Sequence, residues 1–354
     1  MFVTWAHYII PKCSFVLSFI SNPLFIFLIH NNEKVLLGPY RYLLYFFASF
    51  NMLASLADLL VPVCVYGYRY AFVTFIVDGP FSSRSQFGED SIAYRCAFIS
   101  GTYGILNVHF IFRYLILKRN NLLTRYFMPY GLILSIGYVF FHWIAWVLVD
   151  LKCLYSVPEM RDYIRDSFRE LYHVEIDTIN LVAGLYYETS PDITHRSWAG
   201  ILLMTFIAVY SMILYFVLGY KIVTGIQNDL GTMSRKTVQM QRQLFKALTI
   251  QTVIPICVSF LPCTCSFYGS ALRIDFVNWV YWGATVAVSM FPFLDPLAII
   301  FFLPALRRRL GIKFGRVSVS QSAHDQGSKN HGLITTVSMD QQPYTERYQI
   351  DISN

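Results

Sequence analysis

The sequence predicts an all-α membrane protein, a bundle of seven transmembrane helices, from three observations. The 354 residues are 55% hydrophobic and only 14% charged, which is too apolar for an ordinary soluble domain. The apolar residues form seven long blocks, each reaching the roughly 20 residues that a helix needs to cross a bilayer. The basic residues cluster beside these blocks, so the net charge of +7 does not indicate a nucleic-acid partner. The predicted spans are about 8–29, 42–65, 94–117, 128–149, 198–220, 244–268 and 277–303.

The distribution of Lys and Arg predicts the orientation of the chain, because cytoplasmic connections carry an excess of basic residues. One set of alternate connections holds 15 basic residues, whereas the other holds 9, and 5 of those lie in one long loop that the rule discounts. We therefore expect the amino terminus outside and the tail from Pro304 in the cytoplasm. The first block lacks the basic start and cleavage site of a signal peptide, so we expect a signal anchor. The basic connections are 30–41, 118–127, 221–246 and 304–316.

Two acidic residues fall within predicted spans, Asp58 in the second and Asp295 in the last. A carboxylate at membrane depth is costly and needs a partner. We interpret the two acids as an ion or proton site coupled to a conformational switch. The alternative is a static core acid held by hydrogen bonds. Asp295 precedes Pro296, which weakens the helical hydrogen-bond ladder at that point.

The third span is the predicted centre of the bundle. Small residues between Ser100 and Gly104 allow neighbouring helices to approach closely. Further along, His109 and Arg113 are four residues apart and share one helix face. An Arg near a span centre costs ~2.5–3.5 kcal/mol on insertion scales and usually has a function. We interpret this pair, with the adjacent Tyr114, as a latch that a cytoplasmic partner engages; the alternative is an Arg that snorkels to lipid phosphates.

The outer connections differ in how much they reveal. In the long loop 150–197, Arg residues recur every four positions between Pro158 and Tyr172, with acidic residues between them. This pattern predicts a short solvated helix with ion pairs. Its apolar stripe is interpreted as the face of a lid over the bundle mouth, and direct ligand contact is the alternative. The loop 66–95 shows no chemistry that we can name.

Five of the seven cysteines lie within spans and are interpreted as small apolar residues. Cys96 and Cys153 both fall at the outer face, where disulfides persist. A bridge between them would tie the third span to the long loop, but sequence cannot set their separation, so a bridge and two free thiols both stay open. His142, in the fourth span, is interpreted as a helix-packing residue, because no second metal ligand is near it.

The segment before span six is cationic and runs directly into that span. Arg242 and Lys246 are predicted to lie on a helical extension of span six into the cytoplasm. Pro255 and Pro262 kink a helix, so span six has the features of a moving lever. Neutralisation of the cations by anionic lipid is the alternative interpretation.

The chain after the seven-helix domain 1–303 divides into two parts. Apolar residues recur every four positions among arginines, which predicts an amphipathic interfacial helix over 304–316. The polar stretch 317–354 predicts a disordered cytoplasmic tail.

The sequence contains none of the common catalytic or cofactor motifs. A Gly-rich phosphate loop, His-Glu-x-x-His, Gly-x-Ser-x-Gly and Cys-x-x-Cys are all absent, and these motifs mark phosphate, zinc, nucleophile and redox sites. We therefore expect no enzyme activity, no cofactor and no metal.

Five motifs stand out between roughly residues 8 and 316: Pro39-Tyr40-Arg41-Tyr42-Leu43-Leu44, His109-Phe110-x-x-Arg113-Tyr114, Arg161-Asp162-Tyr163-Ile164-Arg165 through Leu185-Tyr186-Tyr187, Arg242-Gln243-Leu244-Phe245-Lys246-Ala247-Leu248 with Gln251-Thr252-x-x-Pro255, and Phe293-Leu294-Asp295-Pro296-Leu297. Together these motifs resemble those of the Str-type nematode chemosensory receptors. This resemblance implies a GPCR-like bundle that senses small, volatile odorants in the cilia of sensory neurons. It also implies that Phe112-Arg113-Tyr114 occupies the place of the Asp-Arg-Tyr latch of rhodopsin-like receptors, and Leu294-Asp295-Pro296 that of Asn-Pro-x-x-Tyr.

The resulting hypothesis is a chemosensory receptor that activates a heterotrimeric G protein. A small odorant binds in the outer half of the bundle, where spans three, five, six and seven form the walls under the loop 150–197. Movement of span six opens a cytoplasmic pocket near Arg113, Arg242 and Lys246. Two alternatives stay open: an odorant-gated channel with its amino terminus inside, and a secondary transporter that uses Asp58 and Asp295. The expected ligand positions, chosen by depth in the bundle, are Thr102, Tyr103, Leu106, Met204 and Tyr268.

Overall fold

The computed structural model describes most of the chain up to the end of the last predicted span. These residues lie in the first of two compact units, Met1–Lys313. The predicted interfacial helix 304–316, apart from Leu306, and the predicted tail 317–354 lie outside the described residues. The described residues are 2–31, 38–76, 78–118, 126–228, 235–274, 278–303 and 306.

Long helices dominate the described residues, as the apolar blocks predict. Six helical segments are long and apolar enough to cross a membrane within these residues, and α3 is a further long helix of 32 residues. The helices are α1 (Phe2–Asn31), α2 (Tyr40–Leu60), α3 (Gln86–Leu117), α5 (Leu132–Cys153), α7 (Pro191–Asn228), α8 (Arg235–Pro255), α9 (Leu261–Ala271) and α10 (Asn278–Phe302).

The predicted span six consists of α8 and α9 joined by a π-helical turn, Ile256–Phe260. This turn lies between Pro255 and Pro262, each of which removes a backbone donor from the helical ladder. The helix begins at Arg235, so it extends well before the apolar block, as predicted. A second π-helical turn, Phe127–Gly131, precedes α5.

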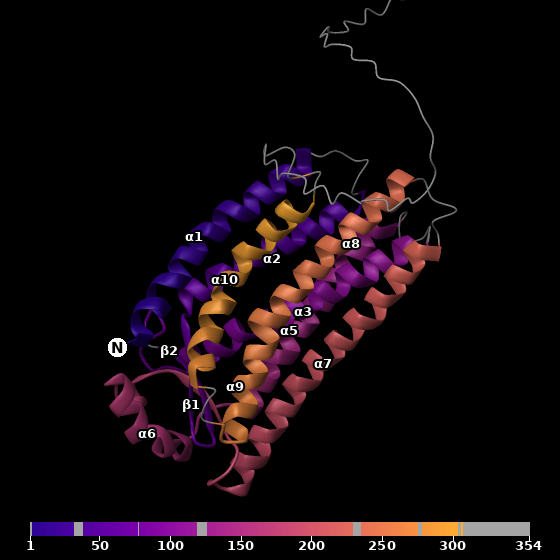
Figure 1. Cartoon of the computed structure of the whole chain (residues 1–354). Coiled ribbons are helices and arrows are strands. Elements are labelled where there is room, and N and C mark those ends of the chain that lie inside the picture. Colours follow the sequence, from indigo (N-terminus) through magenta and orange to yellow (C-terminus); the bar gives the residue numbers. More distant parts are fainter. Residues whose placement is uncertain are drawn as a thin grey trace, which may run out of the picture. The chain divides into compact units, whose positions relative to one another are not determined.

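Helix α3 lies among α2, α5, α7 and α8, whereas α1 packs on α2 and α10 (Figure 1). Its glycines allow the close approach that the sequence predicts. A Cβ atom at Gly101 would lie 2.6 Å from the Phe50 ring, and one at Gly104 would lie 3.2 Å from the backbone of Val139. Side chains at these two positions would therefore push α2 and α5 away from α3.

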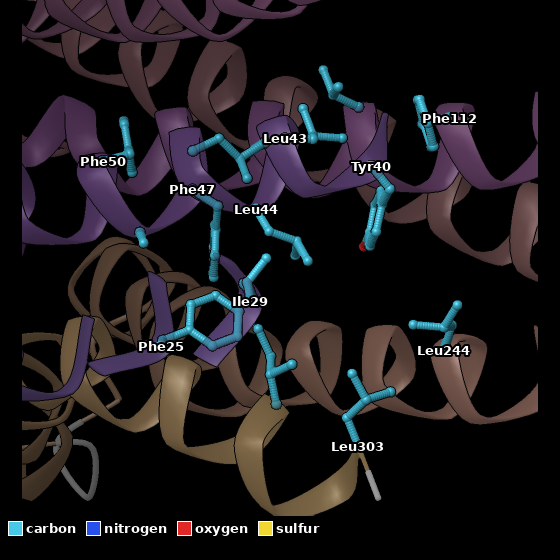
Figure 2. Close-up of a cluster of buried hydrophobic side chains, with 14 of the residues drawn as sticks. Phe25, Ile29, Tyr40, Leu43, Leu44, Phe47, Phe50, Phe112, Leu244 and Leu303 are labelled. Carbon is cyan, nitrogen blue, oxygen red and sulfur yellow. The ribbon is translucent and has the colours of Figure 1, made fainter. Parts of the chain in front are cut away.

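A large apolar cluster joins α1, α2, α3, α8 and α10 (Figure 2). Phe25 and Phe47 are completely buried within it. At one end of the cluster, the ring of Tyr40 stacks on Phe112 with 5.4 Å between centroids. This packing fixes the start of α2 against α3.

A three-stranded antiparallel sheet covers one end of the bundle, which we call the sheet end (Figure 1). This sheet is absent from the predicted all-α fold. The second predicted span ends at Leu60 rather than 65, because Pro62 disfavours continuation of the helix, and the supposed loop 66–95 contains a hairpin and the start of α3. Strands β1 (Val63–Tyr68) and β2 (Ala71–Ile76) are rich in β-branched and aromatic residues, which favour strands, and β3 is Leu181–Leu185. The register pairs Val63 with Ile76 and Ala71 with Leu185.

Helix α6 (Pro158–Tyr172) confirms the short helix that the Arg spacing predicts. Its buried stripe packs on the sheet, where the rings of Phe168 and Phe75 lie 4.9 Å apart. On its exposed side, Arg165 pairs with Asp162 at 2.6 Å and also with Asp177. The hydrogen bond from Arg165 lowers the pKa of the Asp177 carboxyl below its ordinary value.

Candidate functional site

The described residues enclose cavities inside the bundle, and two of them lie toward the sheet end. The larger one, which we call the central cavity, offers about 60 Å³ to the centre of a water molecule. All three strands and α3, α5, α7, α9 and α10 contribute to its walls. These helices include the four spans that the sequence analysis assigned to a ligand pocket. A space of this size exceeds what one water requires, so it has room for a small organic molecule.

A buried ion pair, Asp58 with Arg95, links α2 to α3 beside this cavity. Arg95 Nε donates to Asp58 Oδ1 at 3.0 Å, and a second guanidinium nitrogen also contacts that oxygen. Both side chains are almost completely buried. Arg95 was not among the predicted site residues, because it stands at the boundary where the predicted outer loop 66–95 meets the predicted span 94–117. The sequence does contain a signal for the earlier start of this helix, because Ser85 is a favoured residue type at a helix N-cap. In the structure, Ser85 caps α3 and accepts a hydrogen bond from Gly88 N–H at 3.0 Å.

The second cavity, which we call the small cavity, offers about 30 Å³ beside this pair. Arg95, Ile99 and Val288 line both cavities. Arg95 therefore belongs to the walls of both spaces, whereas its partner Asp58 lines the small cavity. A change in the central cavity that moved Arg95 would also change the small cavity.

One helical turn beyond the small cavity, three buried polar residues meet from α2, α8 and α10. Asp295 is fully buried, with the amides of Asn51 and Gln251 beside its carboxylate. Neither carboxylate oxygen forms a hydrogen bond of good geometry with the described residues. Asp58 and Asp295 thus have different polar neighbours in the structure: Arg95 beside the first, and the two amides beside the second. The interpretation of the two acids as one ion site has no contact to support it.

The predicted latch residues lie at the end of the bundle opposite the sheet, which we call the far end. Tyr40, the first residue of α2, hydrogen-bonds His109 Nδ1 at 2.8 Å. The guanidinium of Arg113 lies 3.7 Å from the centroid of the Tyr40 ring. Arg113 is 7% exposed, and its Nε and Nη2 atoms have no hydrogen-bond partner among the described residues. An aromatic ring thus contacts the buried cation, and the sequence analysis did not identify this role of Tyr40.

The other predicted switch residues surround this group more loosely. Tyr114 is half-buried, with Lys221 Nζ 5.7 Å from its ring centroid. Arg242 and Lys246 are exposed on α8, and Lys246 Nζ lies 6.0 Å from the Phe302 ring. Pro296 is inside α10 beside Asp295. The two cations of α8 are therefore exposed at the surface, whereas the cation of Arg113 is buried inside the bundle.

The five predicted ligand positions separate into two sets. Met204 lines the central cavity, and Thr102 lines the small cavity. The other three, Tyr103, Leu106 and Tyr268, line neither of these two cavities. The Tyr103 carbonyl accepts a hydrogen bond from Tyr215, and the Tyr268 hydroxyl pairs with Thr205. Depth along a helix indicated the level of the pocket, but only the packing shows which face lines it.

Cys96 and Cys153 are both free thiols in the structure, so the bridge left open by the sequence does not form there. Cys96 lines the central cavity. Cys153 instead packs closely against Gly200 of α7. A Cβ atom at Gly200 would lie 2.8 Å from the Cβ atom of Cys153. His142 packs beside Ser100, whose hydroxyl donates to the His142 carbonyl at 3.0 Å. Among the described residues, no group of three or more His, Cys, Asp or Glu side chains could hold a metal ion.

Comparison with known proteins identifies the class of molecule. Residues 1–310 match the family model described as serpentine type 7TM GPCR chemoreceptor Srj. Serpentine receptor class J-38 of Caenorhabditis elegans is 33% identical over 309 residues, which are 86% of this chain and 92% of that protein. G-protein coupled receptor str-33 of the same organism is 25% identical over 260 residues, 72% of this chain and 75% of that protein. Serpentine receptor class r-10 of Caenorhabditis briggsae is 23% identical over 332 residues, 91% and 94% of the two chains.

These matches confirm the predicted resemblance to nematode chemosensory receptors, and the family model narrows it from the Str type to Srj. They also confirm that the chain is a membrane-spanning receptor and not an enzyme. The chain belongs to the Srj family of serpentine, seven-transmembrane G protein-coupled chemoreceptors.

Proposed function

We propose that this receptor binds a small odorant in the central cavity and activates a heterotrimeric G protein at the far end of the bundle. The observation that carries this proposal is a ligand-sized cavity at the sheet end of a chain that belongs to a chemoreceptor family. Most of the cavity surface is apolar, which suits a small ligand with a hydrocarbon part.

Helix α3 provides the physical connection between the two ends. Arg95 and Ile99 line the central cavity, and His109 and Arg113 lie further along the same helix. A ligand can shift the receptor between two states only by its different affinity for them. A ligand that fits the cavity only when Arg95 has moved away from Asp58 has such a difference, because it binds that state alone. The cost of separating the two buried charges holds the empty receptor in the other state.

The proposal includes an orientation and a cellular location. The sheet end faces the exterior, and the far end faces the cytoplasm, as the distribution of basic residues predicts. Family membership supports a multi-pass protein of the plasma membrane. We place the receptor in the cilia of sensory neurons on the strength of the resemblance.

The transporter alternative needs Asp58 as a cation ligand. Arg95 already occupies this carboxylate in the structure.

The proposed cytoplasmic contact surface for the G protein is the region around Arg113, with the exposed Arg242 and Lys246 on α8. These two cations suit an acidic segment of the G protein.

The test is expression in a reporter cell with a promiscuous G protein, screened against volatile odorants. An odorant that activates the receptor should lose its effect in Ala284→Phe, because Ala284 is buried at the central cavity and the larger ring fills that space. We expect at least a tenfold rise in the concentration required for half-maximal response.

The matched control is Ala199→Phe on the exposed surface of α7. It should leave the response close to wild type at equal surface expression. Full activity of Ala284→Phe would remove the central cavity as the ligand site. Silence of a well-expressed wild-type receptor toward the whole panel would argue against an odorant as the ligand class.

A further inference from the structure

We propose that the ligand of the central cavity is a small primary amine, held as an ammonium ion by Asp150. This inference rests on the proposed function, which makes the cavity the ligand site. Asp150 lies in the last turn of α5 and lines the cavity. Asp150 is not among the site residues predicted from the sequence.

Asp150 is a buried carboxylate whose hydrogen bonds are incomplete. It is 3% exposed, and its Oδ2 atom has no hydrogen-bond partner among the described residues. The indole of Trp146, one turn earlier, lies beside the carboxylate, but its N–H group also lacks a hydrogen bond of good geometry. A buried charge without a partner is costly, so the receptor gains if its ligand supplies a donor at this point.

The charges around the cavity favour a cationic donor over a neutral one. Among the described residues that line the central cavity, Arg95 and Asp150 are the charged ones. Arg95 is already neutralised by Asp58, so an ionised Asp150 has no other cation beside it among the described residues that line the cavity. The guanidinium of Arg196, on α7, instead lies 3.5 Å from the Tyr155 ring centroid. A ligand with a single positive charge would restore neutrality.

The rest of the cavity suits the hydrocarbon part of such an amine. Phe72, Trp146 and Phe267 contribute aromatic surface, and an ammonium group is attracted to aromatic faces. The volume of about 60 Å³ for water centres corresponds to several water-sized groups, which fits a short aliphatic chain. These features together indicate a compact amine with one charged end and one apolar end.

The probes are n-butylamine, which is protonated at neutral pH like a Lys side chain, and n-butanol, which has the same skeleton without the charge. Purified full-length receptor in lipid nanodiscs is titrated with each, and binding is measured by the rise in melting temperature, because a ligand that binds the folded state stabilises it. We expect n-butylamine to bind at least tenfold more tightly than n-butanol.

Asp150→Asn keeps the shape of the side chain and removes its charge. It should weaken n-butylamine binding at least tenfold and leave n-butanol binding nearly unchanged. The control, Asp192→Asn, removes an exposed carboxylate from the first turn of α7 and should preserve the preference for the amine. If Asp150→Asn does not fold, the comparison of the two probes on wild-type receptor still decides the ligand class.

Equal affinity for the two probes, or no binding of n-butylamine, would overturn the amine assignment. The proposed function would survive that result if a neutral odorant activated the receptor and lost its effect in Ala284→Phe. The reverse result is also distinguishable. If n-butylamine bound through Asp150 but no tested amine or odorant activated a G protein, the amine site would stand and the signalling proposal would fail.

Discussion

At the scale of single residues, the contact between Arg113 and Tyr40 is the least expected feature of the far end. The buried guanidinium lies over an aromatic ring and has two nitrogens without hydrogen-bond partners among the described residues. A desolvated cation–π contact contributes about 2 kcal/mol, whereas removing one partner of a buried ion pair costs about 3–5 kcal/mol. Arg113 is thus held firmly enough to be ordered, yet it is easier to release than an arginine in an ion pair.

This contact predicts the behaviour of Arg113→Ala. Loss of the cation should reduce agonist-stimulated G protein activation to background, because the proposed latch disappears, while surface expression stays measurable. The measurement is the reporter response normalised to receptor at the cell surface.

Lys152→Ala is the matched control, because it removes an exposed cation from the sheet end. It should signal like wild type. Undiminished signalling by Arg113→Ala would remove the latch role of this residue.

At the scale of elements, α6 is held to the bundle by one buried arginine. Arg161 Nη2 donates to Glu89 of α3 at 2.6 Å, and Nη1 donates to the carbonyl of Ile176 at 2.5 Å. The side chain is 2% exposed, although the sequence pattern suggested that the arginines of this helix face solvent. Burial lowers the pKa of Arg161, with nearby Arg84 in the same direction, and Glu89 opposes this effect.

Arg161→Met should therefore loosen the docking of α6 on the sheet. Removing one partner of a buried pair costs about 3 kcal/mol, and this loss should appear as faster hydrogen exchange of the α6 amides. Arg169→Met is the control, because Arg169 is 70% exposed in its pair with Glu175. Its effect should stay within about 0.5 kcal/mol, and equal exchange in the two variants would show that Arg161 does not anchor the helix.

At the scale of the whole molecule, the polar groups are arranged along the bundle between its two ends. The central cavity is followed by the Asp58–Arg95 pair, the small cavity and the Asp295 cluster. The Tyr40–Arg113 contact lies at the far end. This order gives the proposed receptor a route by which a ligand near the sheet affects the opposite end.

The orientation of this arrangement is directly testable. An amino-terminal extension with a glycosylation sequon should acquire glycan, because we expect that end outside the cytoplasm. The native chain contains no Asn-x-Ser/Thr sequence, so any shift in mass reports the added site. An epitope on the carboxyl-terminal tail should be accessible only after permeabilisation. The reverse pattern would contradict the receptor topology and favour the odorant-gated channel.

The sequence by itself determined the features that depend on the composition of one continuous segment. The long apolar blocks specify membrane-crossing helices because each helix satisfies its own backbone hydrogen bonds in lipid. The four-residue recurrence of arginines specified α6, and the cost of an intramembrane cation drew attention to Arg113. The resemblance of particular motifs supplied the family, which the comparisons then confirmed.

Only the tertiary structure decided which of these residues meet. The partner of Asp58 is Arg95, the aromatic neighbour of Arg113 is Tyr40, and the carboxylate at the central cavity is Asp150. Each contact depends on the rotation and offset of packed helices, and hydrophobic content does not specify these. The sheet joins β3 to a hairpin about a hundred residues earlier in the chain. The physical reason is that insertion into lipid depends on each segment alone, whereas a site forms where several segments pack together.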